Sequence, residues 1–154
     1  MGTAAVGPRR VPPYARVLAV ARVLALVPDL LFGSRLLAGL QARGHEVRLE
    51  PDPAGARARL AADSADAPPD VLVVDLTDKA LDGAGLVAAW RRDGLLAATR
   101  TLGFYAHVDA GTRAAAERAG FDLVVPRSRM AREAPALVER LNDAGSTGLD
   151  DAVS

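Results

Sequence analysis

The stretch DVLVVDL, residues 70–76, decides the fold of this chain. Between Asp70 and Asp75 it contains only valine and leucine. A strand with one face in water alternates apolar and polar side chains, whereas a parallel strand covered by helices on both faces is apolar throughout. The stretch is therefore predicted to be a central strand of a parallel sheet.

Further short apolar runs on either side of it are predicted to be strands. The run EVRLE at 46–50 alternates apolar and charged residues, which is typical of a strand at the edge of a sheet. The others are RVLALV at 22–27, TLGFYA at 101–106 and FDLVVP at 121–126.

The segment after the first strand has helical periodicity. Four leucines share one face at helical spacing and are expected to be buried: Leu31, Leu36, Leu37 and Leu40. Gly44 follows them and is expected to end the helix in a left-handed conformation. The glycine at 120 should end a later helix, AGTRAAAERAG at 110–120, in the same way.

The other helical segments follow the second, third and fifth strands. They are PAGARARLAA at 53–62, GLVAAWRRDG at 85–94 and MAREAPALVERLND at 130–143. Trp90 is expected on the packed side of its helix. The last helix must start near Pro135 or bend there, because proline has no N–H to donate.

The strict alternation of strands and helices predicts an α/β fold, a doubly wound parallel sheet of five strands built from five βα units. This domain is expected to span 21–143. Residues 1–20 are expected to be a flexible leader, and 144–154 a disordered tail. Arg16 and Arg22 interrupt the apolar part of the N-terminal region, so we expect neither a signal peptide nor a membrane span, and a cytoplasmic location.

The composition excludes several kinds of site. The 154 residues include no cysteine, so disulfides and thiolate metal sites are excluded. Nineteen basic residues balance nineteen acidic ones, and aromatic residues make up only 4%. With no basic excess and few rings on which bases could stack, the chain is not expected to bind nucleic acid.

In doubly wound sheets, ligands bind at the carboxyl ends of the strands. His45 precedes the second strand, at the opposite edge, and is expected to be a surface turn residue. The candidates at the carboxyl edge are Asp29, Asp75, His107, Asp109, Arg127 and Ser128.

Three stretches together resemble the receiver domain of bacterial response regulators. They are LLAGLQARGHEVRLEPDPAGARARL at 36–60, PDVLVVDL at 69–76 and AERAGFDLVVPRS at 116–128. The resemblance covers roughly 22–143 and implies a flavodoxin-like, CheY-like fold. It also implies a phosphoacceptor carboxylate at the end of the third strand, and Asp75 stands at that position.

The other positions of the phosphorylation site depart from the family's pattern. Pro28 replaces one member of the acidic pair that holds Mg²⁺, and Asp29 remains. Tyr105 stands where a serine or threonine is expected, and Val125 where a lysine precedes proline. Because phosphoryl transfer depends on positioning and charge compensation, the resemblance is to a degenerate receiver, or pseudo-receiver.

Most candidate residues have both a functional and a structural interpretation. Asp75 is either a phosphoacceptor or a carboxylate that accepts backbone N–H bonds from the next turn. Asp29 either holds Mg²⁺ together with Asp75 or caps the following helix. His107 is either a cation or anion ligand or a loop residue bonded to a carboxylate.

The remaining candidates adjoin the last two helices. Asp109 is expected to cap the helix at 110–120. Ser128 is expected to cap the last helix, and Arg127 either helps to bind an anion there or lies in a solvated loop.

We expect a stand-alone signalling domain, not an enzyme, that needs no cofactor and acts through contacts with a partner protein or a second copy. The resemblance implies a contact surface on the fourth and fifth helices and the fifth strand. One alternative is a phosphorylatable receiver that uses Asp75 with Mg²⁺, and another is a metal- or anion-binding enzyme at the carboxyl edge. The residues expected on the contact surface are Arg113, Arg118, Arg132 and Glu139.

Overall fold

The structure is a computed structural model and describes residues 20–63, 67–106 and 110–153. These residues form a parallel sheet of five strands in the order β2-β1-β3-β4-β5. The strands are β1 (Arg22–Leu26), β2 (Glu46–Glu50), β3 (Val71–Asp75), β4 (Arg100–Tyr105) and β5 (Leu123–Pro126). The helices are α2 (Leu30–Ala42), α3 (Pro53–Asp63), α4 (Gly83–Arg92), α5 (Ala110–Ala119) and α6 (Arg127–Val153). The predicted five-stranded α/β fold is confirmed.

Strand β3 lies in the middle of the sheet, between β1 and β4. Its four apolar residues are buried, as the unbroken apolar run predicts, and Asp75 at its end is buried too. The alternating strand β2 lies at one edge of the sheet, also as predicted.

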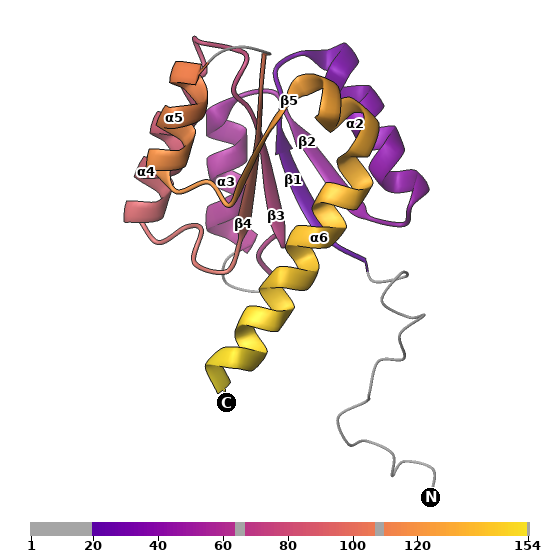
Figure 1. The fold of residues 1–154 in the computed structure, drawn as a ribbon, viewed down its shortest axis with the longest axis vertical. Coiled ribbons are helices and arrows are strands. Elements are labelled where there is room, and N and C mark those ends of the chain that lie inside the picture. The colour runs from indigo at the N-terminus through magenta and orange to yellow at the C-terminus, as the bar shows by residue number, and fades with distance from the viewer. Residues whose placement is uncertain (1–19, 64–66, 107–109, 154) are drawn as a thin grey trace, which may run out of the picture.

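Helices cover both faces of the sheet, as Figure 1 shows. Helices α2 and α6 pack on one face, where Leu40 and Met130 are fully buried. Helices α3, α4 and α5 pack on the other, with Leu60 and Trp90 in its core. The predicted burial of Trp90 is confirmed. We call these two layers the α2/α6 layer and the α3/α4/α5 layer.

The buried face of α2 differs from the prediction at two residues. Leu36 and Leu40 are buried, but Leu37 is only partly buried and Leu31 is 65% exposed. Leu31 precedes Leu36 by five residues, a rotation of about 140° around the helix from that side chain. Phe32 packs against the core instead, and its ring centroid lies 4.8 Å from that of Phe104.

Helix α6 begins and ends outside the predicted bounds. It starts at Arg127, three residues before Met130. Its backbone is non-helical at Glu133, two residues before Pro135, which confirms the predicted bend. The sequence predicts a disordered tail from residue 144, but the helix continues to Val153, and its end projects beyond the sheet in Figure 1. Within the described ranges, no helix is long and apolar enough to cross a membrane.

Candidate functional site

The carboxyl ends of β1, β3, β4 and β5 meet at one edge of the sheet. The strand register pairs Asp75 with Phe104 and Tyr105 with Pro126. Asp29 follows β1 and Arg127 follows β5 directly. The fold therefore brings the described candidates to one edge, as predicted.

Asp29 has contacts on both carboxylate oxygens. Its Oδ1 accepts hydrogen bonds from the N–H groups of Leu31 at 3.0 Å and Phe32 at 3.1 Å, so Asp29 is the N-cap of α2. Its Oδ2 accepts a hydrogen bond from Nη2 of Arg127 at 3.0 Å. The Phe32 amide, helped by Arg127 and the Leu31 amide, holds the pKa of Asp29 below its usual value against a smaller opposing effect of desolvation.

Arg127 is held on two sides. Besides the ion pair with Asp29, its guanidinium carbon lies 4.5 Å from the centroid of the Phe32 ring, in a cation–π contact. The same ring packs on Phe104 in the core. Arg127 thus joins the first turn of α6 to the first turn of α2.

Among the described residues, the side chain of Asp75 forms hydrogen bonds only with Thr77. It is 3% exposed, and its Oδ1 accepts hydrogen bonds from the backbone N–H and the hydroxyl of Thr77. These contacts match the structural interpretation of Asp75, in which its carboxylate holds the turn after β3. Among the described residues, no hydrogen bond or ion pair joins Asp75 to Asp29 or Arg127.

Tyr105 and Val125 belong to the two cores. Tyr105 is 8% exposed and packs in the α3/α4/α5 layer, and Val125 is 1% exposed in the α2/α6 layer. Ser128 is exposed in the first turn of α6, so the prediction that it precedes and caps this helix is wrong. The helix begins directly after Pro126, whose fixed φ suits a helix start.

His107 and Asp109 lie outside the described residues. Among the residues that are described, no group of three or more histidine, cysteine, aspartate or glutamate side chains could hold a metal ion. The metal expectation for Asp29 and Asp75 therefore remains a prediction.

The expectation for His45 is wrong. Its side chain is fully buried at the amino edge of the sheet, and its Nε2 lies 2.8 Å from Oε2 of Glu139. The sequence does indicate this burial. A residue directly after a left-handed cap glycine such as Gly44 commonly packs back onto the helix that has just ended.

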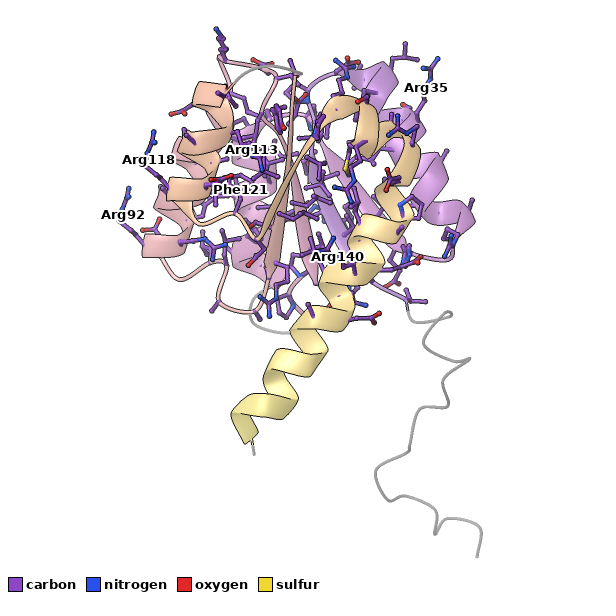
Figure 2. All side chains as sticks on the ribbon, in the orientation of Figure 1. Arg35, Arg92, Arg113, Arg118, Phe121 and Arg140 are labelled. Atoms are coloured by element: carbon purple, nitrogen blue, oxygen red, sulfur yellow. The ribbon has the colours of Figure 1, made fainter. Side chains whose placement is uncertain are left out.

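The residues expected on the contact surface separate into two groups. Arg118 extends from α5 into solvent, as Figure 2 shows, and Arg113 on α5 and Arg132 on α6 are also exposed. Glu139 does not belong with them. Its carboxylate also accepts a hydrogen bond from Arg43 at 2.8 Å, so it faces the end of α2.

No protein-family model and no curated protein matches this chain. Solved structures do match. A CheY-like response regulator receiver domain protein from Methanospirillum hungatei JF-1 has a TM-score of 0.71 at 13% identity, over 84% of this chain and 99% of that one. Chemotaxis protein CheY4 from Vibrio cholerae has a TM-score of 0.67 at 21% identity, over 80% and 99%. The signal receiver domain of NarL from Mycobacterium tuberculosis has a TM-score of 0.64 at 25% identity, over 80% and 96%. The chain therefore has the fold of response regulator receiver domains.

Proposed function

We propose that this chain is an atypical receiver-like signalling domain, of the pseudo-receiver kind, that acts through protein contacts and without phosphorylation. On this proposal it is a cytoplasmic signalling module and not an enzyme, and it needs no cofactor. Its partner is another protein or a second copy of the chain.

The observation that carries the proposal is the state of Asp29. The receiver resemblance makes it the remaining ligand of an acidic pair for Mg²⁺. Its two oxygens are instead bonded to the amides of α2 and to Arg127. The positive charge of Arg127 already compensates this carboxylate, which weakens its attraction for a second cation such as Mg²⁺, an ion that gives up its water reluctantly.

The surrounding positions support the same conclusion. Val125 stands at the lysine position and is part of the core, so it offers no positive charge to a phosphoryl group. The buried ring of Tyr105 fills the position of a small hydroxyl side chain. Phosphoryl transfer relies on such charge compensation and has little other chemistry to draw on.

The proposed contact surface is formed by α5, β5 and the start of α6. Arg118 has no ion-pair partner among the described residues, and the ion pairs of Arg113 with Glu117 and of Arg132 with Glu133 are largely exposed. Exposed guanidinium groups of this kind form bidentate contacts with carboxylates. We therefore propose that the partner presents acidic side chains to this surface.

The test is phosphorylation with a small donor. The purified protein is incubated with Mg²⁺ and acetyl phosphate and followed by intact mass, and with beryllofluoride and followed by NMR. We expect no gain of a phosphoryl mass and no shifts around Asp29 and Asp75. A gain of one phosphoryl group that is lost in Asp75→Asn would overturn the proposal.

One observation favours a second candidate, a phosphorylatable receiver. Asp75 stands at the end of β3, and its Oδ2 accepts no hydrogen bond from the described residues, so one oxygen could act as the nucleophile. In that case Asp29 would hold Mg²⁺ and Arg127 would be the charge partner. The same experiment separates the candidates, and tight metal binding that is lost in His107→Ala would instead support a metal-dependent enzyme.

A further inference from the structure

His45 lies at the amino edge of the sheet, opposite the carboxyl edge that holds Asp29 and Asp75. The turn after α2 places it there. Gly44 has a φ of +88°, and the N–H groups of Gly44 and His45 donate to the carbonyls of Gln41 and Leu40. This hydrogen-bond pattern closes a helix end and directs the following side chain inward.

The imidazole of His45 joins two segments that are distant in the sequence. Its Nδ1 accepts a hydrogen bond from the backbone N–H of Ala21 at 3.0 Å, directly before β1. Its Nε2 bonds to Oε2 of Glu139 on α6 at 2.8 Å. The other oxygen of Glu139 accepts a hydrogen bond from Arg43 at 2.8 Å.

These contacts fix the protonation state that the fold requires. A backbone N–H can only donate, so Nδ1 must be the unprotonated nitrogen that accepts from Ala21. A carboxylate can only accept, so Nε2 must carry the proton and donate it to Glu139. The structure therefore requires the neutral imidazole in its Nε2–H form.

We propose that His45 links the start of β1 to α6 and that protonation of its imidazole breaks this link at β1. We call this link the latch. In the neutral form it holds Ala21 and Glu139 together. A second proton on Nδ1 would place two donors opposite each other, so the hydrogen bond from Ala21 must break and the start of β1 loses its link to His45. This proposal does not depend on the proposed signalling function.

The charges around His45 do not replace the lost bond. Glu139, from α6, accepts from Nε2 in both protonation states, and Arg43 at the end of α2 already compensates its charge. Nδ1 points to the backbone of Ala21, where no carboxylate among the described residues bonds to it. The other charged groups beside the latch line a hollow of about 440 Å³ at this edge, and they are Arg22, Glu46 and Arg48.

The test follows the imidazole and the amide together by NMR on the whole protein. At neutral pH, the nitrogen shifts of His45 should show a bare Nδ1 and a protonated Nε2. As the pH is lowered, the exchange protection of the Ala21 amide should fall by about tenfold or more in step with protonation of His45. His107→Gln, which removes the other histidine, should leave this step unchanged, and His45→Gln should abolish it.

Two results would overturn the latch. One is a neutral imidazole whose proton lies on Nδ1. The other is an Ala21 amide that stays protected after His45 has gained its second proton. Both are measured on the unsubstituted protein, so the test holds even if His45→Gln does not fold.

Discussion

Asp29 has structural contacts at a position where the receiver resemblance implies a metal ligand. The ion pair with Arg127 is nearly half exposed on both sides, so water screens it. The two hydrogen bonds from α2 amides are local and satisfy donors that every helix start leaves open. Capping is therefore the main contribution of Asp29, and the charge of Arg127 adds to it.

The capping role predicts a specific dependence on pH. The pKa of Asp29 in the folded protein lies below its ordinary value. Its carboxylate therefore stabilises the fold above about pH 4, and this contribution is lost as the pH falls through the folded pKa. Asp29→Asn keeps a capping side chain but removes the charge. It should be less stable than the wild type at pH 7 and approach it at pH 3, as measured by urea unfolding.

The control for this prediction is Asp93→Asn. Asp93 faces Arg57 across 3.9 Å, and both side chains are more than half exposed. Because water screens this exposed pair, removing the charge of Asp93 should change the stability little. A stability difference between Asp29→Asn and the wild type that is equal at pH 7 and pH 3 would contradict the inference that the negative charge of Asp29 stabilises the fold.

At the scale of the elements, glycines set where helices end. Gly44 and Gly120 have φ values of +88° and +92° and end α2 and α5, as the sequence predicts. The turn at Gly44 does more than end α2, because it also buries His45 against Glu139. The turn between α2 and β2 therefore also contacts α6.

Two glycines of the same region should respond in opposite ways to alanine. Gly44→Ala forces a side chain into the left-handed region and should cost about 1–2 kcal/mol. Gly39 lies inside α2, and an added Cβ there meets nothing within 4 Å. Gly39→Ala should therefore stabilise the protein by up to about 1 kcal/mol, since alanine favours helix more than glycine does. Urea unfolding of both variants checks the prediction, and destabilisation by Gly39→Ala would show that the outer side of α2 is more crowded than the structure indicates.

At the scale of the whole molecule, one sheet supports two helical layers. The side chains of β3 and β4 point alternately into each layer, so that Leu72 is buried in the α3/α4/α5 layer and Leu102 in the α2/α6 layer. Neither layer can lose its packing without exposing the shared strands. The two layers should therefore unfold together.

Alanine substitutions on the two faces test this cooperativity. Leu72→Ala and Leu102→Ala should each cost about 2–5 kcal/mol, because both side chains are fully buried. Circular dichroism reports the helices of both layers, and Trp90 fluorescence reports only the α3/α4/α5 layer. In urea the two signals should shift to the same new midpoint in each variant. A Leu102→Ala variant whose Trp90 transition stays at the wild-type midpoint would show that the layers unfold separately.

The sequence by itself determined the order and type of the elements, the central place of β3 and the edge place of β2, and it limited the effect of Pro135 to a helix start or a bend. These features follow from periodicity, breakers and caps, which act over a few neighbouring residues. The predictions for Leu31 and His45 were wrong, although both outcomes follow from local geometry. Helical rotation places Leu31 away from the face of Leu36, and the turn at Gly44 directs His45 inward.

Only the tertiary structure decided which side chains meet. Arg127 and Asp29 are 98 residues apart, and His45 and Glu139 are 94 apart. Both contacts exist because α2 and α6 pack side by side on one face of the sheet. Local pattern places each residue on its element, but the partner of a charged side chain depends on the packing of elements that are distant in the chain. For that reason the sequence indicates the capping role of Asp29, but only the packing of α2 against α6 shows that Asp29 pairs with Arg127 and that Glu139 pairs with His45.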